Sequence, residues 1–280
     1  MHFISSDFFW MGLLLFAFII FNISGYIKCN LPGSSFLKNR FGRYFLYSNL
    51  KSVYKPFLVQ YFPVYNRLSE TDQILFERRV QRFINMKTFL TRGDLGKVTP
   101  EMKALIAGSA IQITMGYPDV YFSHFRTIII YPDKYYSRIT KQYHNGEVNQ
   151  LGVIVLSWKS FMDGFRDPRD GDNLGYHEMA HALKLQNIVE NSDYDFFDKD
   201  TIREFEKEGM KEMQKVKENP DDSFFRSYAA TNLNEFFAVA IESYIERPER
   251  LKDYNPNLYS YLSKILNFDI LTINPYQEIL

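Results

Sequence analysis

The hydrophobic and polar positions divide the chain into an apolar N-terminal run and a longer part of mixed polarity. Residues 8–27 carry no charged side chain, and a helix of about 20 residues rises about 30 Å, enough to cross the hydrocarbon core of a bilayer. A cleaved signal peptide is disfavoured because no Lys or Arg precedes the run and no small-x-small site follows it. A lipoprotein signal is disfavoured because Lys28 directly precedes Cys29. The pattern therefore predicts a retained transmembrane anchor at residues 1–30, with its span at about residues 8–27.

Positive charge follows the apolar run, whereas none precedes it. Lys28, Lys38, Arg40 and Arg43 come after the span without an acidic residue among them. Short segments rich in Lys and Arg stay on the cytoplasmic side of a membrane. The sequence thus predicts a single-pass membrane protein whose remaining chain lies in the cytoplasm.

A basic, aromatic-rich connector at residues 31–67 separates the predicted anchor from a globular domain at residues 68–280. Pro32 and Gly33 begin a break in the pattern. The aromatic side chains of the connector can lie at the headgroup level of a membrane or pack on the domain. The pattern alone fits both arrangements.

The predicted domain has mostly helical periodicity. Ser69 caps a first helix that extends to about Phe89, and Thr99 with Pro100 starts a second, largely buried helix that extends to about Met115. Further helices are predicted over residues 198–218, 233–245 and 256–266.

Two short runs of β-branched residues, 125–131 and 152–158, predict strands. Between them the chain is polar, and Asn145-Gly146 has the sequence of a hairpin tip. A turn-rich loop, 167–173 (DPRDGDN), follows the second run. Long helices with a small sheet predict an α+β fold, mostly helical, behind one transmembrane helix.

Composition narrows the classes of function. The formal net charge is zero, so direct binding to nucleic acid is not expected. The 46% hydrophobic and 17% aromatic content is sufficient for a packed core. Cys29 is the single cysteine, which excludes an internal disulfide framework and a thiolate zinc cage. A metal ion in this protein must therefore be held by histidines and carboxylates.

One pentapeptide carries the strongest chemical signal, His177-Glu178-Met179-Ala180-His181. Positions i and i+4 of a helix share a face, so both imidazoles can reach one metal ion. Glu178 lies beside that face, where its carboxylate can take a proton from a metal-activated water. This is the H-E-x-x-H pattern of zinc peptidases.

A zinc site of this kind needs a third protein ligand and an open position for water. His2, His124 and His144 lie in contexts typical of surface or packing histidines. Glu235, Glu242 and Glu246 are stronger candidates, because carboxylates in an apolar helix need a partner. Their spacing does not rank the three. A purely structural zinc site is disfavoured, since such sites close with four protein ligands and no fourth is evident.

The stretch GVIVLSW-(x)8-DPRDGDN-(x)3-HEMAHAL, followed by SYAATNLNEFFAVAIESYIERP, resembles the Mlc titration factor A family of zinc metallopeptidases. These gluzincin-like proteins are related in their core to the anthrax lethal factor protease. The resemblance runs from about residue 68 to 268 and implies a zincin-like domain with one Zn²⁺ per chain. It implies His177, His181 and Glu235 as zinc ligands, Glu178 as general base and Tyr228 as the tyrosine that faces the substrate oxygen.

The chain departs from the resemblance at one position near the motif. Family members commonly carry an Asp three residues after the second zinc histidine, where this chain has Lys184. If that acid orients a ligand, this chain must orient it in another way.

The expected function is a membrane-anchored peptidase that cleaves peptide or protein substrates with a zinc-activated water. The predicted strand before the metal helix offers an edge on which an extended substrate can pair. The alternative is a regulatory protein that sequesters a transcription factor, with little hydrolysis. The resemblance implies this alternative, because the founding member of the family binds a repressor.

Overall fold

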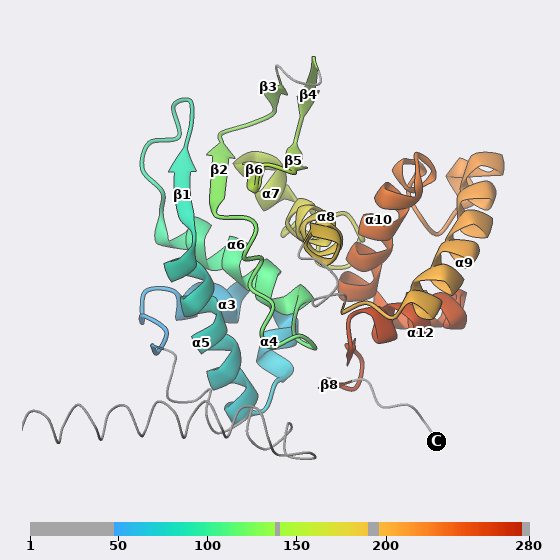
Figure 1. Ribbon diagram of the computed structural model, residues 1–280, viewed down its shortest axis with the longest axis horizontal. Helices are drawn as coiled ribbons and strands as arrows, with labels where there is room; N and C mark the ends of the chain where they lie inside the picture. The colour runs from blue at the N-terminus through green and yellow to red at the C-terminus, as the bar shows by residue number, and fades with distance from the viewer. Residues whose placement is uncertain (1–47, 138–140, 190–195, 276–280) are drawn as a thin grey trace, which may run out of the picture. The chain divides into compact units, whose positions relative to one another are not determined.

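The computed structural model describes residues 48–137, 141–189 and 196–275 (Figure 1). Polar side chains cap its long helices. Ser69 accepts a hydrogen bond from the Asp72 amide, and Thr99 accepts one from the Met102 amide, both at 3.2 Å. These are the two caps that the sequence predicts. Such caps pair amide groups that the first helical turn leaves without a partner.

The described residues contain many helices and only a little strand. In chain order the helices are α3 (Lys55–Tyr61), α4 (Pro63–Arg67), α5 (Glu70–Met86), α6 (Pro100–Ile113), α7 (Trp158–Asp163), α8 (Leu174–Val189), α9 (Lys199–Glu218), α10 (Leu233–Glu246), α11 (Pro248–Tyr254) and α12 (Pro256–Ile265). Two short 3-10 turns precede α10, η1 (Pro220–Asp222) and η2 (Ser227–Ala230). The fold is therefore α+β and mostly helical, as the sequence predicts.

A four-stranded mixed sheet has the order β1-β2-β6-β5. Its strands are β1 (Thr88–Thr91), β2 (Thr127–Tyr131), β6 (Val153–Ser157) and β5 (Gly146–Asn149). The first three run parallel, with Thr127 opposite Val153, and β5 runs antiparallel to β6. Two small hairpins complete the strands, β3 (Tyr135–Ser137) with β4 (Gln142–His144), and β7 (Phe268–Asp269) with β8 (Asn274–Pro275).

Three details of the sheet correct the sequence predictions. The first predicted helix does not reach Phe89, because α5 ends at Met86 and β1 begins at Thr88. Asn145-Gly146 is not a hairpin tip but the junction between β4 and β5, and the turn from β5 to β6 uses Gly152 with φ +80°. The strand at 152–158 is also not an edge strand, since β6 lies between β2 and β5. The unpaired edge near α8 belongs to β5.

The described part of the predicted connector packs into the domain. Helices α3 and α4 place Leu58 and Phe62 in the interior with no exposed surface, and residue 48 onward forms one compact unit. The predicted boundary between residues 67 and 68 stays a prediction. The predicted span at 8–27 lies outside the described residues, and no helix within them has the length and apolar character to cross a membrane.

Helix α6 is the centre of the core. Every residue from Ala104 to Ile113 is buried, and α6 contacts α3, α5 and α8. Helix α8 in turn contacts β5 and β6 on one side and α10 on another, so it lies between the sheet and the C-terminal helices (Figure 1). This arrangement places the predicted metal helix inside the fold, with the edge strand β5 beside it.

Candidate metal centre

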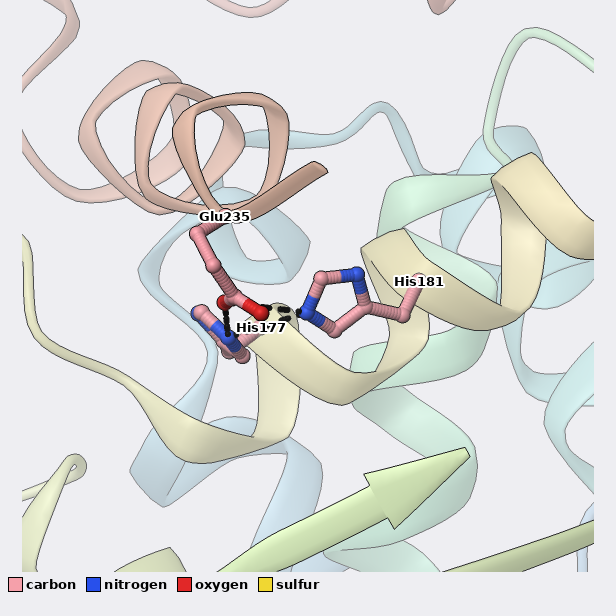
Figure 2. Close-up of side chains that lie close together, drawn as sticks. All are labelled: His177, His181 and Glu235. Atoms are coloured by element: carbon pink, nitrogen blue, oxygen red, sulfur yellow. Dashed lines mark hydrogen bonds and ion pairs between the residues drawn. The ribbon is translucent and has the colours of Figure 1, made fainter. Parts of the chain in front are cut away.

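Two helices bring the predicted ligands together. His177 and His181 lie one turn apart on α8, and Glu235 lies in the first turn of α10. Figure 2 shows both imidazoles directed toward the Glu235 carboxylate. The two Nε2 atoms lie 3.1 Å apart, and Glu235 Oε2 lies 3.1 Å from Nε2 of His177 and 3.3 Å from Nε2 of His181. Within the described ranges, this is the one group of His, Cys, Asp and Glu side chains arranged to hold a metal ion.

The triangle of ligand atoms fits one face of a metal tetrahedron. At metal–ligand distances of ~2.0–2.1 Å, two corners of a tetrahedron lie ~3.3 Å apart. The three observed separations, 3.1, 3.1 and 3.3 Å, are close to this value. Two imidazole nitrogens and a carboxylate oxygen are also a donor set that divalent zinc favours. The residues present therefore fit a metal ion with a fourth position left for another ligand.

Two of the candidate ligand side chains, His177 and Glu235, shift each other's pKa values. Burial lowers the pKa of His177, but hydrogen bonds with Glu235 and Glu242 outweigh burial and raise this pKa to about 10. For Glu235, burial raises the pKa, whereas hydrogen bonds with His177 and His181 dominate and hold it well below its usual range.

Glu178 follows His177 on α8 and lies against strand β5. Its side chain is buried, with an exposed fraction of 5%. A Cβ atom added at Gly146 would lie only 2.3 Å from Glu178 Oε1 and 2.5 Å from Cδ. Glycine at 146 thus serves a close approach between β5 and the carboxylate rather than a turn. Burial raises the pKa of Glu178, and the positive charge of His177 and His181 opposes that rise.

Tyr228 lies beside His177. It belongs to η2, which contacts α10, and its ring centroid is 5.8 Å from that of His177. The side chain is half exposed at 48%. Burial, followed by the negative charge of Glu235 and a hydrogen bond with it, raises the pKa of Tyr228 to about 12. Its hydroxyl therefore keeps its proton at neutral pH and can donate a hydrogen bond.

The far side of His177 is held by a buried network. Glu242 Oε1 accepts hydrogen bonds from His177 Nδ1 at 2.6 Å and from the Arg226 guanidinium at 2.7 Å. Glu242 Oε2 accepts a third from the Asn173 amide at 2.6 Å, and Arg226 also pairs with Asp172. Of the three glutamates left open by the sequence, Glu242 thus contacts the ring nitrogen remote from the cluster.

A family model described as Glucose-regulated metallo-peptidase M90 matches residues 38–266. The chain belongs to this family of metallopeptidases. Mlc titration factor A of Edwardsiella ictaluri is 25% identical over 231 residues, 75% of this chain and 85% of the relative. Mlc titration factor A of Klebsiella pneumoniae is 26% identical over 213 residues, 70% of this chain and 79% of the relative. An uncharacterized protein of Synechocystis, slr2042, is 26% identical over 217 residues, which are 72% of this chain and 78% of the relative.

Membership of a metallopeptidase family agrees with a metal ion at the His-His-Glu group.

The other side chains that the sequence offered as metal ligands lie outside this group. His124 Nε2 donates to the Gln150 carbonyl at 3.0 Å, His144 packs on Tyr135 with 6.2 Å between ring centroids, and His2 lies outside the described residues. Glu246 accepts hydrogen bonds from Asn173 Nδ2 at 2.9 Å and the Gly171 amide at 3.1 Å.

Lys184, three residues after His181, contacts the helix that carries Glu235. Its Nζ donates to Asn234 Oδ1 at 2.8 Å and lies 5.4 Å from the centre of the Phe237 ring. Lys184 thus ties α8 to the first turn of α10. A lysine thus joins the two helices that carry the proposed ligands.

The sequence did not single out two residues that hold Glu242 in place, Arg226 and Asn173. Asn173 caps α8 by accepting a hydrogen bond from the Tyr176 amide at 3.2 Å, while its Nδ2 donates to the Gly164 carbonyl at 2.9 Å. Only the position of Asn173 at the end of a turn-rich loop could have marked it as a cap. Nothing in the local sequence pairs Arg226 with Glu242, because that contact depends on how η2 lies beside α10.

Proposed function

We propose that this protein is a zinc-dependent peptidase whose zinc ligands are His177, His181 and Glu235. The observation that carries the proposal is the triangle of their three ligand atoms, with edges of 3.1–3.3 Å. A buried carboxylate, Glu178, comes from the same helix as the two histidines. Family membership supports metal-dependent peptide hydrolysis.

Each side chain has a separate task in this proposal. A zinc ion bound there would polarise the peptide carbonyl and lower the pKa of a water molecule toward ~7. Glu178 acts as the general base that accepts the proton of the attacking water and then delivers it to the leaving amine. Tyr228 donates its hydroxyl proton in a hydrogen bond to the oxyanion that develops on the substrate. Its raised pKa of about 12 keeps the hydroxyl protonated for this purpose.

Strand β5 is the proposed docking edge for an extended substrate. Asn145 and Asn149 direct their carbonyl groups to the β6 side, accepting from the amides of Ser157 and Gly152. By the alternation of an antiparallel ladder, Gly146 and Val148 direct their backbone groups to the opposite, unpaired edge. A peptide that pairs there passes Glu178, because Gly146 touches its carboxylate.

The test is Glu178→Gln in the purified full-length chain. We expect loss of cleavage of aminopeptidase and endopeptidase substrates, with zinc still bound at one ion per chain, because the ligands are unchanged. The matched control is Glu212→Gln, a buried glutamate on α9 that bonds Tyr254 and Asn255 and touches no proposed ligand. Unchanged turnover in Glu178→Gln would reject the base assignment.

Membrane anchoring is a separate proposal that rests on residues 8–27 and the positive charges that follow them. We expect the full-length chain to stay in the membrane fraction after alkaline carbonate extraction and to be released when residues 1–30 are deleted. The proposed cytoplasmic orientation predicts that external protease spares the domain in intact cells. Extraction of the full-length chain by carbonate would contradict the anchor.

A second candidate function is regulatory binding of a transcription factor. Two relatives are named Mlc titration factor A, which favours this function. The discriminating experiment is a pull-down of cellular transcriptional regulators with the wild type and with Glu178→Gln. A specific regulator retained equally by both forms, together with no cleavage of it or of model peptides, would favour binding over hydrolysis. Cleavage by the wild type alone would favour the peptidase.

A further inference from the structure

Glu242 contacts His177 at Nδ1, the ring nitrogen that does not face the proposed metal position. It has no exposed surface, and its Oε1 accepts from His177 Nδ1 at 2.6 Å. The ligand atom of His177, Nε2, is the other ring nitrogen and faces Glu235. Glu242 therefore reaches the cluster only through the imidazole of His177.

The surroundings of Glu242 supply hydrogen-bond donors to both of its carboxylate oxygens. Its two oxygens accept three hydrogen bonds, from His177 Nδ1, Arg226 and the Asn173 amide, at 2.6–2.7 Å. Buried carboxylates need such donors and a cationic partner, and the Arg226 guanidinium supplies the positive charge. An imidazole that donates from Nδ1 carries its free electron pair on Nε2, which is the form that binds a metal ion.

The same helix delivers both the third ligand and this acceptor. Glu235 and Glu242 are seven residues apart on α10, about two helical turns, so both lie on the face toward α8. Asn173, which caps α8, donates its backbone amide to Glu242. The start of α8, the middle of α10 and Arg226 before η2 thus meet at one carboxylate.

We infer that Glu242, held by Arg226 and the Asn173 amide, is a positioning residue that fixes the tautomer and ring orientation of His177 for metal binding. This inference rests on the proposed zinc site. It concerns metal affinity, so it can fail while the ligand set stands.

The first test is the zinc affinity of Glu242→Gln, measured by competition with a chromophoric chelator. An amide cannot accept on both sides, because its NH₂ group must face either the Asn173 amide or the donors His177 and Arg226. We expect zinc binding to weaken about 10–100-fold, the usual cost of losing such a partner.

The matched control is Glu212→Gln, the same substitution at another fully buried glutamate. Glu212 also pairs with a cation, Lys215 at 2.8 Å, but contacts none of the cluster residues. We expect its zinc affinity to equal that of the wild type even if its stability falls. Wild-type affinity in a folded Glu242→Gln protein would overturn the inference, whereas failure of the wild type itself to bind zinc would overturn the proposed function.

A second test needs no variant. In the cobalt-loaded wild type, the Nδ1–H protons of ligand histidines appear as strongly shifted NMR signals that exchange with water. We expect the His177 proton to exchange much more slowly than that of His181, because it is donated to Glu242, whose side chain has no exposed surface. Equally fast exchange of both protons, or cobalt bound through Nδ1 of His177, would overturn the inference.

Discussion

Gly146→Ala is the sharpest perturbation that the structure suggests for the proposed reaction. The added Cβ would lie 2.3 Å from Glu178 Oε1, whereas ordinary contacts begin at 3.4 Å. The difference, 3.4 − 2.3, means that the carboxylate or β5 must move by about 1 Å. All three close atoms, Oε1, Cδ and Cγ, belong to the flexible Glu178 side chain, so the fold can persist while the proposed base is displaced.

The expected cost follows from this displacement. A misplacement of ~1 Å near reacting atoms can lower a rate ~10²-fold, equivalent to ~2.7 kcal/mol in the activation barrier. We therefore expect kcat of Gly146→Ala to fall about 100-fold. Zinc binding should stay at wild-type affinity, because the three atoms nearest to the added methyl group all belong to Glu178 and not to a proposed zinc ligand.

The assay is steady-state cleavage of a peptide, with zinc content and circular dichroism measured on the same samples. The control is Gly96→Ala, where the added Cβ meets nothing within 4 Å, although φ is +73° and stability should fall. Its kcat should equal that of the wild type. Wild-type turnover in a folded, zinc-loaded Gly146→Ala protein would refute the reasoning that places Glu178 at the reacting atoms.

Three further predictions use single substitutions. Tyr228→Phe should lower kcat by ~10²-fold, as loss of an oxyanion donor does, and leave the zinc content unchanged; equal kcat would remove Tyr228 from the mechanism. Burial raises the pKa of Glu246 to about 8, so the folded state retains a proton that the unfolded chain releases, and stability should fall as pH rises from about 5 to 8. In Glu246→Gln, the unfolding free energy should depend less on pH over this range. An unchanged pH dependence would contradict the raised pKa of Glu246. Lys184→Met should weaken zinc binding several-fold by releasing Asn234, and unchanged chelator competition would show that this contact leaves the ligands unaffected.

The sequence was sufficient to predict the elements whose signals come from neighbouring residues. The caps at Ser69 and Thr99 and the strand at β2 depend on neighbouring residues, and the structure confirms them. The strand β1 follows α5 after a single residue, so its apolar positions extended the helical pattern and hid the change of period. A pattern read along the chain cannot show where one element stops and another begins without a turn residue between them.

Gly146 was misread for a related reason. Asn-Gly is a strong local turn signal, whereas the need for glycine here comes from a side chain 32 residues away, Glu178. The edge strand was misassigned in the same way, since only the pairing of β6 with both β2 and β5 shows that β5 is outermost. Sequence periodicity identifies strands but does not give their order in a sheet.

In the candidate site, too, local spacing predicted some ligands, whereas others depend on how the helices pack. The spacing of His177 and His181 is a local helical property, so the sequence could place them on one face. Periodicity left Glu235, Glu242 and Glu246 unranked, and the resemblance singled out Glu235. The structure gives the three different surroundings: Glu235 at the Nε2 atoms, Glu242 at Nδ1 of His177 and Glu246 at the loop before α8. Which glutamate faces which nitrogen depends on the packing of α10 against α8.

The central claim is that His177, His181 and Glu235 together hold one zinc ion. Metal analysis with zinc X-ray absorption on the purified full-length chain tests it most directly. We expect one zinc per chain, with two imidazole nitrogens and a carboxylate oxygen at ~2.0–2.1 Å, and loss of that zinc in Glu235→Ala. Stoichiometric zinc held with wild-type affinity in Glu235→Ala, or a first shell without imidazole, would contradict the account.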